Sequence, residues 1–345
     1  MIKERRSDSP KRMTTAPWKQ RYEKFSSPYL GRFNGRIFFR LLITLFVASI
    51  ADFAVINILP GSPAQVILGT QATPQKVATL NAKLGLGAPL YDQYLRWLSQ
   101  LLTMRLGRSY VSGGRIGTEI AQALQITVPL VLGGLGIGII LSIPLAFLIY
   151  LFRQSRASIF VTLVLDLGIS TPSFILGLIL IYTFAIKYSV LPASGFIFWS
   201  TSVVGAIRSL ILPSVALGLV EAAIISRYAK NLIDDVMDTP YIHAARLRGQ
   251  SETQAFLRHG LRNITAPLIT VVGLEASGLL VGAVVVENVF GLPGVGTLLL
   301  NAVQNRDVIV VQDIVMLAVT IVCTINLLVD LSYKRIQPDL RDDVL

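Results

Sequence analysis

The segment ITVPLVLGGLGIGIILSIPLAFLIYL, residues 126–151, decides the fold class of this chain. It contains no charged residue, and it exceeds the roughly 20 apolar residues with which a helix crosses the hydrocarbon core of a bilayer. Hydrophobic residues make up 53% of the 345-residue chain, charged residues make up 15%, and the mean hydropathy is +0.63. Because soluble domains carry about 25% charged residues, the sequence predicts an all-α integral membrane protein.

Six stretches in total are apolar and long enough to span a membrane. They lie near residues 38–59, 124–151, 160–186, 208–230, 264–287 and 309–331. Kinks are expected at Pro129, Pro144 and Pro172, since proline removes a backbone donor from a helix. Glycines four residues apart allow helices to approach closely, which makes four glycines candidates for helix packing: Gly134, Gly138, Gly278 and Gly282.

The distribution of Lys and Arg predicts the orientation. With six spans, the N-terminal tail, the 152–159 turn, the 226–266 loop and the C-terminal tail share one side, which holds 22 of the 31 Lys and Arg residues. Positive charge favours the cytoplasmic side, so both termini are expected there, in the inner membrane of a prokaryote. The net charge of +11 is therefore mainly a topology signal. Contact of the basic tail with anionic lipid is favoured over nucleic-acid binding.

The chain is predicted to divide into a cytoplasmic basic tail (1–37) without stable structure, a transmembrane region (38–331) and a cytoplasmic C-terminal tail (332–345). The segment 60–120 is too long for a plain connection. Ser62 and Thr73 each precede a proline that suits the first turn of a helix, and PLYDQYLRWLSQLL has helical spacing. We expect a helical cap outside the membrane. It either covers the ends of the spans or, with residues 291–306, docks a partner.

Ionisable residues within the spans are expensive in hydrocarbon and should face the bundle interior or lie near an interface. These residues either form a polar lining or a proton relay, or they have a structural role, in which Asp52 and Glu287 lie near the outer ends of their spans and Glu221 pairs with a neighbouring helix. Glu275 lies midway in its span, where lining a pathway and packing are equally favoured. Glu275 and Glu221 are the candidate lining residues.

The stretch YIHAARLRGQSETQAFLRHGLRNITAP, residues 241–267, is basic and lies between two apolar spans. Asp238 or Thr239 can cap a helix that begins at Pro240. Gly249 stands where a left-handed residue ends a helix, and Ser251 with Gln254 forms a capping box for the next one. Ala244 and Ala245 are expected to make a smooth face that docks on a partner helix or groove, with Arg246 and Arg248 pairing to acidic residues nearby. The alternative is an amphipathic loop resting on lipid headgroups.

Several chemistries are absent from the sequence. No Gly-Lys pair occurs, so the chain has no phosphate-binding loop of the Walker type. Neither His243 nor His259 belongs to a metal-ligand pattern, and no histidine lies in a span to serve as a base, which argues against an intramembrane enzyme. A proton-coupled secondary transporter, with Glu275 or Glu221 as its proton site, is one possible function, although the chain lacks an evident inverted repeat. An ion channel is favoured less, because no filter-like segment repeats.

The sequence AARLRG (244–249), followed by Pro267, resembles the cytoplasmic EAA loop of ABC importer permeases of the dipeptide, oligopeptide and nickel branch. The resemblance extends over nearly the whole chain from about residue 38. It includes LPGSPA, LGLGAPLYDQYLRWL, RLGRSY, STPSFILGLILIYTFA, LPASG, GAVVVENVFGLPGVG and NLLVDLSYKRIQPDLR. His243 stands where the general motif has glutamate, which leaves any contact of that carboxylate in doubt here.

The resemblance implies a six-helix permease fold with a coupling helix in the loop 231–265. Its ATPase-coupling residues would be Ala244, Ala245, Arg246, Arg248, Gly249 and Pro267. The implied function is the permease subunit of an ATP-driven importer, with peptides as the expected substrate class. The implied partners are a homologous second permease, two cytoplasmic ATPase subunits or domains that bind ATP and Mg²⁺, an extracytoplasmic solute-binding protein and membrane lipid, but not nucleic acid. The permease itself would carry no cofactor or metal and no catalytic residue.

Overall fold

A computed structural model describes residues 29–58, 63–83 and 85–336. Apart from an isolated bridge between Arg108 and Arg115, the described residues form helices and connections without a β-strand, so the all-α prediction is confirmed. The helices up to residue 151 are α2 (Tyr29–Ile58), α3 (Pro63–Leu68), α4 (Pro74–Lys83), α5 (Leu90–Leu102) and α6 (Ile116–Leu151). Those that follow are α7 (Arg156–Ser170), α8 (Ser173–Leu180), α9 (Val203–Met237), α10 (Pro240–Leu247), α11 (Glu252–Ala255), α12 (Leu261–Val289), α13 (Val295–Gln304) and α14 (Val308–Ile336).

The chain divides into two compact units, residues 1–44 and residues 45–345. Of the first unit, the structure describes the beginning of α2, whose exposed apolar side chains include Phe38 and Phe39. The helix starts at Tyr29, before the boundary at residue 37 that the sequence predicts for the basic tail. The described residues do not include 1–28, Ser62 or 337–345. The predictions for the two tails and for a helix start at Ser62 therefore stay predictions.

In the part of the chain that the structure describes, five helical segments are long and apolar enough to cross a membrane: Ile37–Ile58, Ile116–Leu151, Val203–Met237, Glu252–Val289 and Val308–Ser332. The pair Ser158–Ser170 and Ser173–Lys187 makes a sixth span if it crosses as one unit, but it is bent by 104°. The bend confirms the kink predicted at Pro172. A residue before proline avoids the helical conformation, and Thr171 is accordingly extended, with ψ of 119°.

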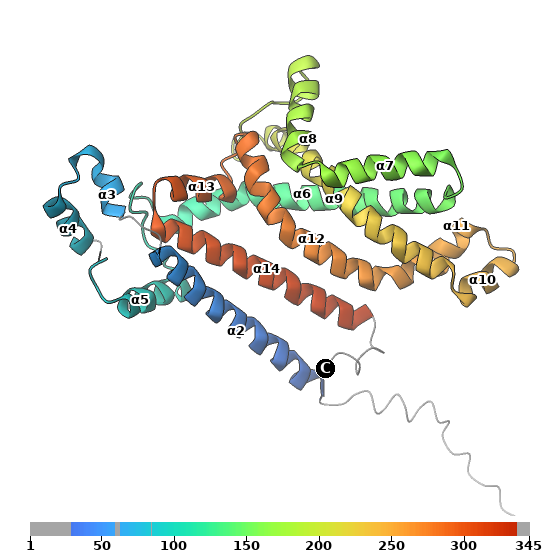
Figure 1. Ribbon diagram of the computed structural model, residues 1–345, viewed down its shortest axis with the longest axis horizontal. Coiled ribbons are helices and arrows are strands. Elements are labelled where there is room, and N and C mark those ends of the chain that lie inside the picture. Colours follow the sequence, from blue (N-terminus) through green and yellow to red (C-terminus); the bar gives the residue numbers. More distant parts are fainter. Residues whose placement is uncertain (1–28, 59–62, 84, 337–345) are drawn as a thin grey trace, which may run out of the picture. The chain divides into compact units, whose positions relative to one another are not determined.

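Within the second unit, α6 and α9 form a closely packed pair that α12 joins (Figure 1). A Cβ added to Gly134 would lie 2.9 Å from Leu217 Cβ, and one added to Gly138 would lie 2.7 Å from Glu221 Cβ. The packing predicted for these two glycines is confirmed, because α9 fills the space that their missing side chains leave. For Gly278, no atom of the described chain lies within 4 Å of the added Cβ, so its packing against another helix stays a prediction. Gly282 reaches only ordinary contact with Leu217, at 3.5 Å.

Helix α6 continues without interruption through Pro129 and Pro144. A proline in a helix leaves the carbonyl four residues earlier without its usual donor. For Pro129 that carbonyl belongs to Gln125, and the indole N–H of Trp199 donates to it at 2.9 Å. The connection between α8 and α9 thus replaces the backbone donor that the proline lacks.

The helices expected between residues 60 and 120 are present as α3, α4 and α5. Tyr94 and Trp97 on α5 contact Phe53 of α2, with ring centroids 5.4 and 6.2 Å apart. The segment 291–306 contains the short apolar helix α13, which packs against α6, α12 and α14. In Figure 1, α13 lies at one end of the α6–α9 pair, and α10 and α11 lie at the other.

Candidate functional site

The turn between α10 and α11 is built by local hydrogen bonds. Gly249 has φ of 90°, as predicted, and donates its N–H to the Arg246 carbonyl at 2.9 Å, while Gln250 donates to Ala245 at 3.3 Å. These two bonds form the Schellman pattern that ends many helices. No atom lies within 4 Å of a Cβ added to Gly249, so backbone conformation, not crowding, requires glycine there.

The capping chemistry of α11 is also confirmed. Ser251 Oγ accepts from Gln254 N at 3.2 Å, and Gln254 Oε1 accepts from Ser251 N at 3.2 Å, which completes the predicted capping box. Thr239 occupies the position before α10, but its hydroxyl donates to the Val236 carbonyl at 2.6 Å and does not cap the helix. Pro240 is the first residue of α10, as expected.

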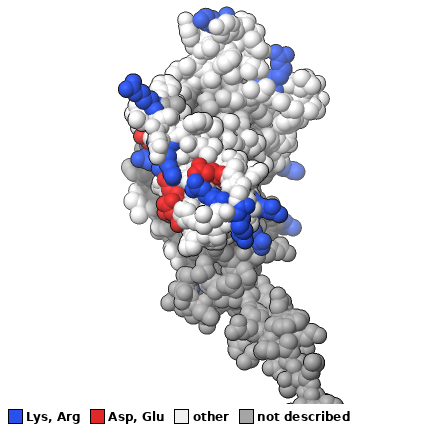
Figure 2. Space-filling view, turned by 90° about the vertical axis from the view of Figure 1, so that its right-hand side faces the viewer, with Lys and Arg blue, Asp and Glu red and all other residues white. Residues whose placement is uncertain are grey.

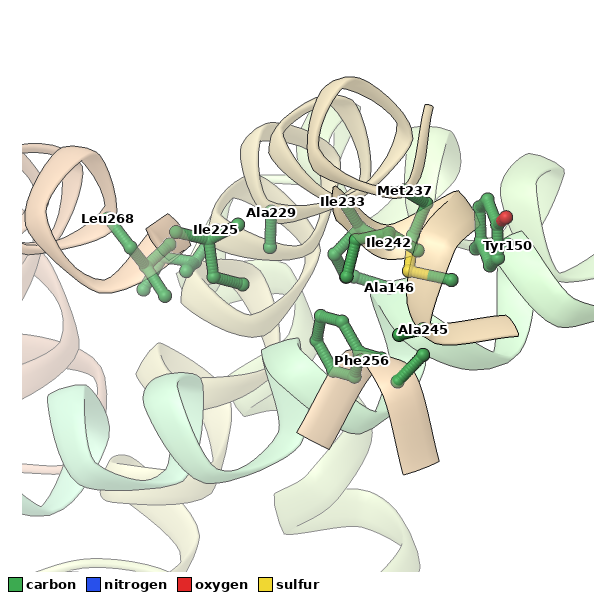
Figure 3. Close-up of a cluster of buried hydrophobic side chains, with 12 residues drawn as sticks. Ala146, Tyr150, Ile225, Ala229, Ile233, Met237, Ile242, Ala245, Phe256 and Leu268 are labelled. Atoms are coloured by element: carbon green, nitrogen blue, oxygen red, sulfur yellow. The ribbon is translucent and has the colours of Figure 1, made fainter. Parts of the chain in front are cut away.

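Helix α10 has a buried face and an exposed face. Ile242 and Ala245 are both 0% exposed, whereas Ala244 is exposed and Leu247 is 90% exposed. Figure 3 shows Ile242 and Ala245 within an apolar cluster to which α6, α9, α12 and the segment after α11 contribute; its other labelled members are Ala146, Tyr150, Ile225, Ala229, Ile233, Met237, Phe256 and Leu268. The expectation that Ala244 and Ala245 share an outward face is therefore wrong. Successive helical residues point about 100° apart, so Ala245 shares its face with Ile242.

The apolar cluster ties the loop to the bundle. Phe256, in the π-helical turn Phe256–Gly260 that leads into α12, stacks on Phe147 of α6 with ring centroids 4.3 Å apart. Asn263 on α12 donates to the Tyr241 hydroxyl on α10 at 2.8 Å. The loop is therefore joined to α6, α9 and α12 by direct side-chain contacts.

Charged groups surround the exposed face of α10. Figure 2 shows Lys and Arg side chains interspersed with Asp and Glu on this side of the molecule. Arg246 pairs with Glu252 across the turn at 2.8 Å, with side chains 38% and 33% exposed. Among the described residues, no ion pair involves Arg248. An open depression of about 580 Å³ is lined by His243, Arg246, Leu247, Gln250, Ser251 and Glu252.

Pro267 lies apart from this surface. It is half-buried within the second turn of α12, which continues through it, and it does not line the depression. The sequence motif is therefore not one contiguous surface. Arg246, Ala244 and Arg248 are exposed, Gly249 shapes the turn, and Ala245 and Pro267 belong to the supporting structure.

The two candidate lining residues come together in the bundle. Glu221 on α9 is buried beside Gly138, and one of its carboxyl oxygens has no hydrogen-bond partner in the described chain. Glu275 on α12 is half-buried and close enough to Glu221 for the two carboxyl groups to interact electrostatically. The helix neighbouring Glu221 thus presents a second acid, and no hydrogen bond between the two carboxyl groups is present in the described chain.

Sequence reasoning missed a set of buried carboxylates near α13 and the start of α14. Asp307 accepts hydrogen bonds from the Ser109 hydroxyl and, at 3.3 and 3.4 Å, from the backbone N–H groups of Tyr110 and Val111. Burial raises the pKa of the Tyr110 phenol; the Asp307 charge raises it further, and Arg96 lowers it. Asp313 accepts from the Trp97 indole at 3.0 Å. The signals in the sequence were Asp307, which ends the polar stretch QNRD (304–307), and Asp313, which follows six residues later within an apolar run.

Comparison with known proteins gives consistent matches along the chain. Residues 134–342 match the family described as binding-protein-dependent transport system inner membrane component, and residues 30–130 match the corresponding N-terminal family. The glutathione transport system permease protein GsiC of Escherichia coli strain K12 is 35% identical over 301 residues, which cover 87% of this chain and 96% of that protein. The protein of the same name from Shigella boydii serotype 4 is 34% identical over the same shares.

Proposed function

This chain belongs to the family of binding-protein-dependent transport system inner membrane components and is a multi-pass permease subunit of an ABC importer, and we propose that it conducts peptides. Its relatives carry the name of a glutathione transport system, and glutathione is a small peptide-like molecule, which supports this substrate class. The chain would form the path together with a homologous second permease. An extracytoplasmic solute-binding protein would deliver the substrate, and both termini would face the cytoplasm.

Two cytoplasmic ATPase subunits would bind ATP and Mg²⁺ and hydrolyse the nucleotide, while this chain carries no cofactor. The observation that supports the coupling is the two-faced α10. Its exposed face, with Ala244, Leu247 and Arg248, is available to a partner, and its buried face is fixed to α6, α9 and α12 through the apolar cluster. Closure of the ATPases would displace α10, and the bundle would rock between inward-open and outward-open arrangements.

The decisive experiment is purification followed by reconstitution. Tagged permease should bring stoichiometric ATPase subunits with it, and proteoliposomes with the binding protein outside should take up peptide in a vanadate-sensitive manner. Transport by this chain alone, driven by a proton gradient, would instead identify a secondary transporter.

Glu221 and Glu275 would line the translocation path without carrying protons. Glu275→Gln should leave ATP-driven uptake largely intact and insensitive to an imposed pH gradient. Proton-coupled uptake in the wild type that disappears in this variant, with normal assembly, would overturn both assignments.

A further inference from the structure

The beginning of α13 is held by a side chain from another helix. The first N–H groups of a helix have no acceptor inside it, and a capping side chain usually accepts them. The residue at the capping position here is Gly294, which has no side chain. The acceptors are instead supplied by Glu287 in the last turn of α12 and by Thr127 of α6.

Every early N–H group of α13 has a partner. Glu287 Oε2 accepts from Gly296 N at 2.8 Å and from Thr297 N at 3.2 Å. Thr127 Oγ1 accepts from Val295 N at 2.8 Å and donates to Glu287 Oε1 at 2.5 Å. Glu287 is 0% exposed, and a carboxylate at a helix N-terminus is stabilised by the partial positive charge of the backbone there.

The two glycines around Val295 make room for this carboxylate. A Cβ added to Gly294 would clash with the Glu287 carboxyl group, and one added to Gly296 would clash with Val284 and with Glu287 Oε2. Small residues at both positions are therefore required by the approach of the carboxylate. This accounts for the spacing of the glycines in GLPGVG (291–296), which a plain turn does not explain.

We infer that Glu287 is the positioning residue that fixes α13 to α12 and α6, so that α13 moves with them as one body. At the other end of α13, Asp307 accepts hydrogen bonds from the segment 109–111. The helix is thus held by a buried carboxylate on either side. Resting on the proposed function, the inference gives α13 a part in transport: rocking of α12 carries α13 across the outer mouth of the path.

The test measures the position of α13 directly. Spin labels at Leu132→Cys on α6 and Gln304→Cys on α13, both exposed, report the distance between the helices in the assembled complex, with Cys323→Ser removing the native thiol. Glu287→Gln replaces an acceptor oxygen with a donor that faces other donors. Thr127→Val is nearly isosteric and removes only the hydroxyl. Both should broaden the distance distribution, and peptide uptake should fall about tenfold, because the penalty for a buried donor without its acceptor is of the order of the free energy of a tenfold change.

The control is Thr320→Val on α14, whose hydroxyl donates within its own helix to the Met316 carbonyl at 2.7 Å. It should leave the distribution and uptake unchanged. ATP hydrolysis stimulated by the binding protein should persist in Thr127→Val, because the coupling surface is unchanged. This variant should therefore keep ATP hydrolysis while its peptide uptake falls. A narrow, unchanged distribution in both test variants overturns the inference even if transport is ATP-driven. Absence of ATPase partners in the wild type would instead overturn the proposed function and leave the distance result standing.

Discussion

The two ends of α12 are held by opposite chemistry. Where α12 begins, at the loop formed by α10 and α11, the buried contacts are apolar, with Phe256 stacked on Phe147 and Ile242 of α10 inside the cluster, and the hydrogen bond from Asn263 to Tyr241 lies at the exposed surface. Where α12 ends, Glu287 is bound by directional hydrogen bonds to α6 and α13. Apolar contact depends on area and not on direction, whereas a buried charged group depends on each partner. The loop end therefore depends on the fit of apolar surfaces, whereas the α13 end depends on each of its hydrogen bonds.

The largest expected effect comes from a charge placed in the apolar end. Ala245→Glu would put a carboxylate at a fully buried position, within a hydrophobic cluster whose residues carry no positive charge. An uncompensated buried charge costs about 3–5 kcal/mol, so the variant should lose assembled complex on size-exclusion chromatography. Ala244→Glu, one residue away and exposed, is the matched control and should fold normally. Equal yields of the two variants would contradict the two-faced arrangement of α10.

The next effect should appear in ATPase binding alone. Leu247→Asp replaces an apolar side chain that is 90% exposed with a charge on the proposed docking face. Because a central interface residue contributes more than about 1 kcal/mol, copurified ATPase should fall about tenfold while the thermal midpoint of the permease stays unchanged. Leu90→Asp on α5, another exposed leucine, provides the control and should retain its ATPase subunits. Full ATPase retention in Leu247→Asp would favour the loop that rests on lipid headgroups.

A smaller effect is expected at the turn itself. Gly249→Ala forces a residue with a β-carbon into a left-handed conformation, which costs about 1–2 kcal/mol. The thermal midpoint of the complex should decrease by a few degrees. Gly117→Ala in the first turn of α6 serves as the comparison, since its added Cβ meets no atom within 4 Å and its φ is not positive. A decrease of the same size in both variants would show that the turn conformation is not what glycine provides.

The smallest effect should follow the loss of the surface ion pair. Arg246→Gln removes the contact with Glu252, which is partly exposed and therefore worth less than about 1 kcal/mol. The thermal midpoint of this variant should change less between low and high salt than that of the wild type. Salt weakens the wild-type ion pair by screening, and the variant has no such pair to lose. Lys230→Gln, which removes the pair with Asp234 at 2.8 Å on α9, should behave in the same way. If Arg246→Gln lowered the free energy of unfolding by several kcal/mol, the loop end would also depend on directional polar contacts.

Local features of the fold were predictable from the sequence. The left-handed Gly249, the capping box of Ser251 and Gln254, and the break at Pro172 each depend on a few neighbouring residues. The spans were predictable because a bilayer requires long apolar helices.

Features that depend on distant partners were not predictable. The burial of Ala245 is decided by α6 and α9, and a run of small residues does not reveal which of them faces inward. Gly278 shows the same limit, since a glycine pair does not say whether a helix lies opposite it. Glu287 was expected at the outer end of its span, but its partner Thr127 lies 160 residues earlier in the chain.

That long separation has a consequence for biosynthesis. Because translation proceeds at about 5–20 residues per second, Thr127 enters the membrane on the order of ten seconds before Glu287 is made. During this interval its later partners Glu287 and Val295 do not yet exist, and its hydroxyl can bond a backbone carbonyl of its own helix instead. The hydrogen bonds that join Thr127 and Glu287 to residues 295–297 can form only after these residues have followed Glu287 out of the ribosome. The end of the bundle at α13 is therefore completed late in synthesis, well after α6 and α9 have been made and can pair.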